Sequence, residues 1–274
     1  MSISFEGVIF SRPGETGLIP YIGALWAAES ENKINNVTVW ISPSTTSFIS
    51  MMKILDYSCI DIMALLSMLP SLAAAPTPFN NTLNLGGKLD EIKSVLAIKI
   101  LEKMGNIPTL QELFDRTGKV FVGIGFSLIT QEVEYIHRET YPTMSLLDAV
   151  CISLSTPGIY RPYSVGNEVW IDGSIIEPFS PCSIELESNN VLAITTKQIK
   201  IVFNNKDPIN QVKDIMKSAF ESLRHVNLSG NFSLVRINSV SKEHSLQLRE
   251  GWEAYSTTFR VEEPLVQEGA ELQS

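Results

Sequence analysis

A serine at a strand-to-helix turn is the first residue whose type and position could do chemistry. Ser44 follows residues 37–41, a β-branched run that predicts a buried strand, and precedes an apolar helical pattern over 48–58. A tight turn of this kind lifts a hydroxyl to the carboxyl edge of a sheet, where a nucleophile meets its substrate. Taken alone, Ser44 reads equally well as a helix cap, because serine is favoured at that position for structural reasons.

An acid and a loop could complete such a site. Asp172 comes directly after a predicted strand and is followed by Gly173, a pair that is also common in plain turns. Residues 12–17 (RPGETG) join a predicted strand at 5–10 to a helix at 18–31. Backbone N–H groups at that helix start could stabilise an oxyanion, or the segment is only a connection.

The elements that must position these residues follow from the hydrophobic pattern. Two successive strand-helix units at the N-terminus predict a parallel α/β sheet with helices against its faces. Further strands are expected at 119–129 and 132–137, and further helices at 88–104, 109–118, 144–155 and 212–226. We expect one α/β domain over residues 1–261, completed by helix, strand and helix after residue 207, and an acidic tail over 262–274.

Composition excludes several classes of protein. The 274 residues are 44% apolar and carry a net charge of −9 with no basic stripe, which argues against nucleic-acid binding. Three widely spaced cysteines suit buried reduced thiols better than a disulfide framework. We read no secretory signal and no membrane-spanning stretch, and therefore expect a cytoplasmic protein.

Residues 62–87 contain no charged side chain, which is unusual for a surface segment. One reading is a helix docked in the core and then a covered loop. The other is an apolar lid that contacts an acyl chain or a membrane surface, or that joins copies of the chain in an oligomer.

Taken in order, these segments resemble the patatin-like phospholipases from about residue 5 to residue 196. The most specific part is 148–181, which is similar to the family's A-x-x-A-S-x-A-x-P-x-x-F-x-P followed by a strand and Asp-Gly. The residues at comparable places are Ala149, Ser153, Ser155, Pro157, Tyr160, Pro162 and Asp172-Gly173-Ser174. The resemblance implies a doubly wound α/β sandwich with a mainly parallel sheet and helices on both faces. It also implies a lipid acyl hydrolase of phospholipase A or esterase type that needs no cofactor or calcium.

The same resemblance places Ser44 on the family's nucleophile and Asp172 on its base, which form a dyad without histidine. A carboxylate serving alone must have its basicity raised by its surroundings. Attack of the serine on a lipid ester would give an acyl-enzyme that water then cleaves.

Two supporting motifs depart from the family pattern. The serine turn reads Ser42-Pro43-Ser44-Thr45-Thr46, without the two glycines of G-x-S-x-G. The family's anion loop G-G-G-x-[KR]-G retains only Gly14 and Gly17, with Glu15 and Thr16 between them, and a proline removes one N–H donor. The alternative function is therefore a catalytically inactive relative that binds lipid or serves as an oligomeric scaffold.

Histidine offers weaker alternatives. A Ser-Asp-His triad would need His225, which lies in a predicted helix, or His244, which composition places on the surface. His137 follows a strand and is expected to be solvated. No pair of histidines has the spacing of metal ligands, so we expect no metal site.

Overall fold

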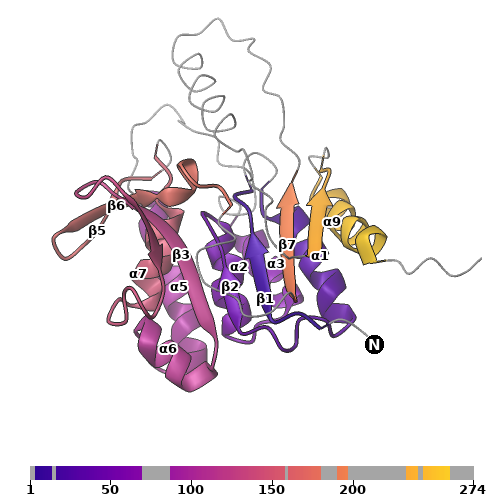
Figure 1. The fold of residues 1–274 in the computed structure, drawn as a ribbon, viewed down its shortest axis with the longest axis horizontal. Coiled ribbons are helices and arrows are strands. Elements are labelled where there is room, and N and C mark those ends of the chain that lie inside the picture. Colours follow the sequence, from indigo (N-terminus) through magenta and orange to yellow (C-terminus); the bar gives the residue numbers. More distant parts are fainter. Residues whose placement is uncertain are drawn as a thin grey trace, which may run out of the picture.

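The computed structural model describes residues 4–13, 17–69, 87–157, 160–179, 190–196, 233–239 and 243–259. Within these ranges the chain forms one mixed β-sheet with helices packed against it (Figure 1). This architecture confirms the predicted α/β class and the mainly parallel sheet. The division into a domain and an acidic tail stays a prediction, because residues 260–274 lie outside the described ranges.

In the described part of the chain, the parallel strands are β1 (Gly7–Phe10), β2 (Val39–Ile41), β3 (Val120–Ser127), β7 (Val191–Thr196) and β8 (Ser233–Ile237). They stand in the order β3-β2-β1-β7-β8, with β1 at the centre. Because neighbouring strands are parallel, their carboxyl ends meet at one edge of the sheet. Ligands of open α/β sheets bind at that edge.

An antiparallel extension continues the sheet beyond β3. The strands β4 (Val133–Ile136) and β6 (Glu168–Asp172) both run antiparallel to β3, and β5 (Tyr163–Val165) pairs with β6. The predicted strands at 119–129 and 132–137 correspond to β3 and β4. The strand predicted just before Asp172 corresponds to β6. Strand β5 and its hairpin with β6 were not predicted; the turn of this hairpin contains Gly166 with φ +60°. In this extension β6 ends at Asp172, which pairs with Gly125 of β3.

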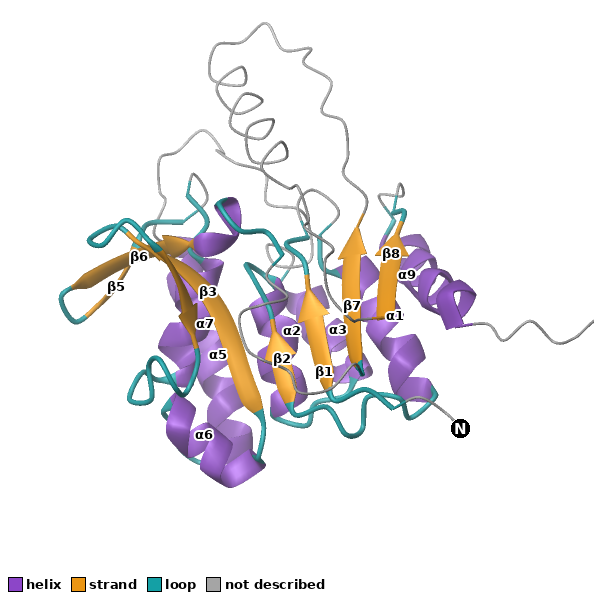
Figure 2. Cartoon of the chain, viewed as in Figure 1, coloured by secondary structure: helices purple, strands orange, loops and turns teal. Residues whose placement is uncertain are grey.

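The helices that follow in the described ranges are α1 (Ile19–Ser30), α2 (Thr46–Ile54), α3 (Cys59–Met68), α5 (Gly87–Met104), α6 (Leu110–Thr117), α7 (Leu146–Leu154), η2 (Gly173–Ile175, a 3₁₀ turn) and α9 (His244–Phe259). Figure 2 shows α1, α2 and α3 behind the strands β2, β1 and β7. Alternate residues of β1 serve the two faces: Val8 and Phe10 join the large core with these helices, whereas Ile9 joins a smaller cluster with Phe179. The helix predicted at 212–226 lies outside the described residues.

The prediction of one continuous helix over 48–58 is wrong. The helix α2 ends at Ile54, Asp56 takes a positive φ of +58°, and Ser58 caps the start of α3. The Ser58 hydroxyl accepts from the N–H of Asp61 at 3.1 Å in a capping box, which makes a new helix start. Within α3, Ile62 and Leu66 are buried, so the first part of the uncharged segment 62–87 is a core helix. Residues 70–86 lie outside the described ranges.

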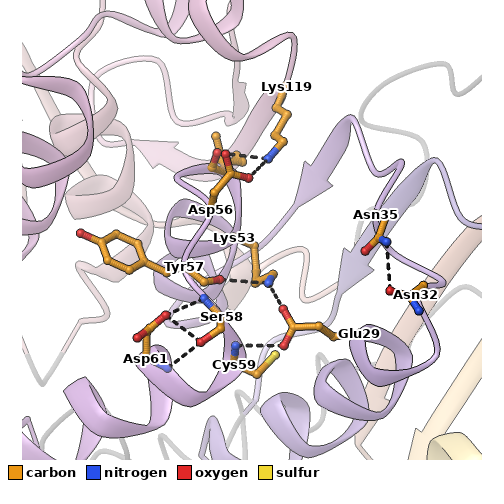
Figure 3. A network of polar contacts seen from close by, with 11 residues as sticks. Glu29, Asn32, Asn35, Lys53, Asp56, Tyr57, Ser58, Cys59, Asp61 and Lys119 are labelled. Carbon is orange, nitrogen blue, oxygen red and sulfur yellow. Dashed lines mark hydrogen bonds and ion pairs between the residues drawn. The ribbon is translucent and has the colours of Figure 1, made fainter.

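A polar network joins the last turns of α1 and α2 to the first turn of α3 (Figure 3). Glu29 of α1 forms an ion pair with Lys53 of α2, and its second carboxylate oxygen accepts from the N–H of Cys59 at 3.1 Å. The Lys53 ammonium also donates to the carbonyl oxygen of Tyr57 at 2.9 Å. Burial alone raises the pKa of Glu29, but the Lys53 charge and the Cys59 N–H outweigh it and lower that pKa. The network therefore ties three helices together.

The cysteines that the structure describes fit the prediction of reduced core thiols. Cys59 and Cys151 are free and fully buried. Burial raises the pKa of Cys151 to about 12, which suits an inert core residue rather than a nucleophile. Cys182 lies outside the described residues.

Candidate active site

Ser44 lies on a sharp turn between β2 and α2. The strand ends at Ile41, the helix begins at Thr46, and Ser44 takes a φ of +55°, a left-handed conformation that is strained for a residue with a Cβ. A sharp, strained strand-to-helix turn is the geometry of a nucleophile elbow. Ser44 is 5% exposed and stands at the carboxyl edge of the parallel strands.

Two hydroxyl groups support this turn, and one of them belongs to Thr46, which stands where the pattern G-x-S-x-G has its second glycine. The Thr46 hydroxyl donates to the carbonyl oxygen of Pro43 at 2.5 Å, and the Ser47 hydroxyl donates to the carbonyl oxygen of Ser44 at 2.7 Å. Ser42 and Thr46 are both completely buried. The helix cap is Thr45, so the alternative in which Ser44 itself caps α2 is wrong.

Asp172 is placed by close packing of two main chains. Its N–H donates to the carbonyl oxygen of Ser155 at 3.0 Å, which binds the end of β6 to the end of α7. A Cβ at Gly173 would lie 2.7 Å from the carbonyl oxygen of Gly125, too close for any side chain. The glycine after Asp172 is therefore required by the close approach of the two main chains.

The carboxyl group of Asp172 is wholly buried and surrounded by donors. Oδ2 accepts from the Thr156 hydroxyl at 2.8 Å, and Oδ1 accepts from the N–H of Ser174 at 2.9 Å. Burial raises the pKa of Asp172 above its ordinary value; hydrogen bonding by Ser174, Ser44 and Thr156 and the positive charge of Arg12 act in the opposite direction. The structure thus brings Ser44 to Asp172, although the two are far apart in the chain.

The segment after β1 approaches the same place. Arg12 is 6% exposed, and its main-chain N–H donates to the carbonyl oxygen of Pro178 at 2.8 Å. The Ser11 and Tyr21 hydroxyls lie 2.8 Å apart and join this segment to α1. Gly17 takes a φ of +69° just before α1. Gly14, Glu15 and Thr16, three of the four residues expected to form the oxyanion loop, lie outside the described residues.

Comparison with known proteins decides the family. The patatin-like phospholipase family matches residues 21–182, more than half of the chain and a range that holds both Ser44 and Asp172. The chain belongs to the patatin-like phospholipase family. It is similar to "Probable lipid hydrolase 463L" of Invertebrate iridescent virus 6, at 25% identity over 179 residues. That match covers 60% of this chain and 61% of the viral protein, so the chain spans about three fifths of its curated relative.

A solved structure supports the same fold. VipD from Legionella pneumophila superposes with a TM-score of 0.64 at 14% sequence identity, over 93% of this chain and 66% of that protein. At this identity the likeness shows the patatin-like fold and nothing further.

Neither of the two histidines that the structure describes, His137 and His244, contacts the Ser44–Asp172 pair. His137 is 7% exposed, so the prediction that it is solvated is wrong: burial lowers its pKa, and its Nδ1 accepts from the N–H of Glu139 at 3.3 Å. His244 begins α9 and is exposed, as expected. His225 lies outside the described residues. Among the residues that the structure describes, no three His, Cys, Asp or Glu side chains gather where a metal ion could bind.

Sequence reasoning missed two residues of the site. Thr156 occupies an unspecified position of the family pattern, and nothing in its type marks it as an Asp partner. Arg12 was considered only as the first residue of the loop over residues 12–17, and the burial of its side chain was not predicted.

No helix in the described ranges is long and apolar enough to cross a bilayer. The cytoplasmic location stays a prediction.

Proposed function

We propose that this protein is a lipid acyl hydrolase of phospholipase A or esterase type, with Ser44 as nucleophile and Asp172 as general base. The observation that carries the proposal is the strained φ of Ser44 on a strand-to-helix turn, with its hydroxyl beside a buried carboxyl group. Family membership and the lipid-hydrolase name of the viral relative support a lipid ester as the substrate.

The proposed reaction has two halves. The Ser44 Oγ attacks the ester carbonyl carbon while its proton passes to the Asp172 carboxylate. The tetrahedral intermediate then collapses, the C–O bond to the alcohol breaks, and that alcohol leaves with the proton from Asp172. In the second half a water molecule gives a proton to Asp172 and attacks the acyl-enzyme. The fatty acid departs, and Ser44 recovers its proton.

A raised pKa suits Asp172 to this role. A carboxylate of ordinary acidity is a weak base toward an alcohol, and burial increases its affinity for the proton. The donors around it limit that increase, so that the carboxyl group can still ionise. The dyad therefore depends on a balance between desolvation and hydrogen bonding.

The developing oxyanion needs positive potential. Helix α2 begins at Thr46, two residues after Ser44, and the dipole at its N-terminus favours negative charge there. The Arg12 guanidinium adds positive charge close enough to act on Asp172. We propose that Gly14–Gly17 supply N–H donors, with Glu15 and the missing glycines making this support weaker than in the family pattern.

Hydrolysis of a short-chain nitrophenyl ester and of phosphatidylcholine vesicles tests the proposal. Wild type should release nitrophenol and free fatty acid, and Ser44→Ala should lose both activities by at least about a thousandfold. Ser50→Ala is the matched control, because Ser50 is a buried serine of α2, the helix that follows Ser44, and lies outside the proposed dyad. Equal background rates in wild type and Ser44→Ala would favour the inactive, lipid-binding relative.

A further inference from the structure

Thr156 joins the end of α7 to the carboxyl group of Asp172. Its hydroxyl donates to Oδ2 at 2.8 Å, while the preceding residue, Ser155, accepts the N–H of Asp172 at 3.0 Å. One hydrogen bond thus fixes the main chain of Asp172 and the other fixes its side chain.

The position of Thr156 is itself well determined. Its N–H donates to the carbonyl oxygen of Leu154 at 2.7 Å, and its own carbonyl oxygen accepts from the N–H of Tyr160 at 3.0 Å. Pro157 follows, with a φ fixed by its ring, and forms a bridge with Tyr160. The hydroxyl is therefore held at Asp172 by a braced main chain.

The two oxygens of Asp172 have separate anchors. Ser174 holds Oδ1 through its N–H, and Thr156 holds Oδ2. With both oxygens anchored, the carboxyl plane cannot rotate freely, and its orientation toward Ser44 is set before a substrate arrives. Hydrogen bonds of this kind to a carboxylate are stronger than bonds between neutral groups.

We propose that Thr156 is a positioning residue of the Ser44–Asp172 dyad, which orients the Asp172 carboxyl toward Ser44 by holding Oδ2. The proposal rests on the proposed acyl-hydrolase function. Thr156 does not touch the reacting atoms and acts only through Asp172.

The charges and donors that face Asp172 define what a Thr156 variant changes. Arg12 comes from the segment after β1, Ser44 from the turn before α2, and Ser174 from η2. We expect all three to stay in place when the Thr156 hydroxyl is removed. Loss of this one donor to the carboxylate should therefore raise the pKa of Asp172 further, by about one unit.

The test compares Thr156→Val, which keeps the shape and removes the hydroxyl, with Thr156→Ser, which keeps the hydroxyl. The pH profile of kcat/KM for a nitrophenyl ester should move its acid limb up by about one pH unit in Thr156→Val. In Thr156→Val we expect kcat to fall about 10- to 100-fold with little change in KM. Thr156→Ser should have the kcat and the pH profile of wild type. Thr143→Val, at an exposed threonine before α7, is the control that should change nothing.

A second measurement does not depend on turnover. Carbon-13 NMR titration of the side-chain carboxyl, assigned by its disappearance in Asp172→Asn, should show a higher pKa in Thr156→Val than in wild type and Thr156→Ser. Identical titrations and superimposable pH profiles in the three proteins would overturn the proposal. Wild type without Ser44-dependent turnover would instead refute the proposed function, and with it the role of Thr156 in catalysis.

Discussion

The hydroxyl of Thr46 donates to the main-chain carbonyl oxygen of Pro43 at 2.5 Å, inside the turn that carries Ser44. The family pattern has glycine at position 46, and a β-branched residue there is expected to obstruct the turn. In this chain the threonine is completely buried, and its hydroxyl satisfies a carbonyl group that the turn leaves outside the helix. The missing glycine is thus replaced by a side chain that takes part in the turn.

This contact predicts a stability effect. Thr46→Val should lower the free energy of unfolding by about 1–3 kcal/mol, because it leaves the Pro43 carbonyl oxygen buried without this donor. Thr46→Ser retains the hydroxyl, and its free energy of unfolding should fall by about half as much or less. Urea unfolding followed by circular dichroism measures both. A valine variant as stable as wild type would contradict this account of the turn.

The strand, turn and helix around Ser44 could be predicted from local sequence patterns. A β-branched run, a short polar segment and an apolar helical pattern predicted strand, turn and helix around Ser44, and the structure has them. The elements at β3, β4 and α7 followed from the same local patterns. The break at Asp56 did not, because a positive φ in an aspartate has no strong sequence signal and the helical pattern continues across it.

The surroundings of Asp172 were harder to predict, because they depend on contacts between distant segments. The Asp-Gly pair predicted a turn. Its actual constraint is the approach of Gly173 to Gly125, which no local pattern contains. Thr156, after α7, and Arg12, after β1, likewise come from segments that no local pattern around Asp172 contains.

Burial of Asp172 predicts that ionisation of its carboxyl group destabilises the folded protein. Since the folded-state pKa of Asp172 is raised, its protonated form is favoured in the folded protein. The protonated carboxyl group contributes its full stabilisation below the pKa of Asp172 in the unfolded chain, near 3.8. This stabilisation is lost as the pH rises through the pKa of Asp172 in the folded protein. Asp172→Asn cannot ionise, so its melting temperature relative to wild type should increase from pH 4 to pH 8.

Thermal melts of both proteins across that range check this prediction. Asp148→Asn, at a half-buried aspartate in the first turn of α7, is a comparison variant with its own hydrogen bonds. A melting-temperature difference between wild type and Asp172→Asn that stays constant with pH would show that Asp172 has an ordinary pKa.

Helix α9 depends on two glycines where it crosses α1. A Cβ at Gly251 would lie 1.8 Å from the carbonyl oxygen of Pro20, and a Cβ at Gly23 would lie 2.0 Å from that of Leu248. These main chains touch directly, so Gly251→Ala must push the helices apart. We expect a loss of about 1–3 kcal/mol in the free energy of unfolding. Thr257→Ala, at an exposed site of α9, should be neutral or slightly stabilising. Similar unfolding curves for the two variants would contradict the packing.

The ion pair between Glu29 and Lys53 predicts a pH-dependent loss. Lys53→Met should destabilise the fold by about 1–3 kcal/mol at pH 7, since Glu29 keeps its burial and loses its cation. The lowered pKa of Glu29 stabilises the fold above the unfolded pKa, and this contribution disappears as pH falls through the folded value. The difference in the free energy of unfolding between Lys53→Met and wild type should therefore become smaller in acid.

The control is Arg249→Met, which breaks an exposed ion pair and should lower the free energy of unfolding by no more than about 0.5 kcal/mol. Equal losses in both variants would argue against the network.

Covalent labelling with a fluorophosphonate tests the central claim most directly, because it reports the reactivity of one hydroxyl without assuming a substrate. We predict a single phosphonyl adduct, mapped by peptide mass spectrometry to Ser44, that is absent in Ser44→Ala and strongly slowed in Asp172→Asn. An unmodified Ser44 in the folded wild-type protein, or equal labelling rates in wild type and Asp172→Asn, would contradict the Ser44–Asp172 dyad.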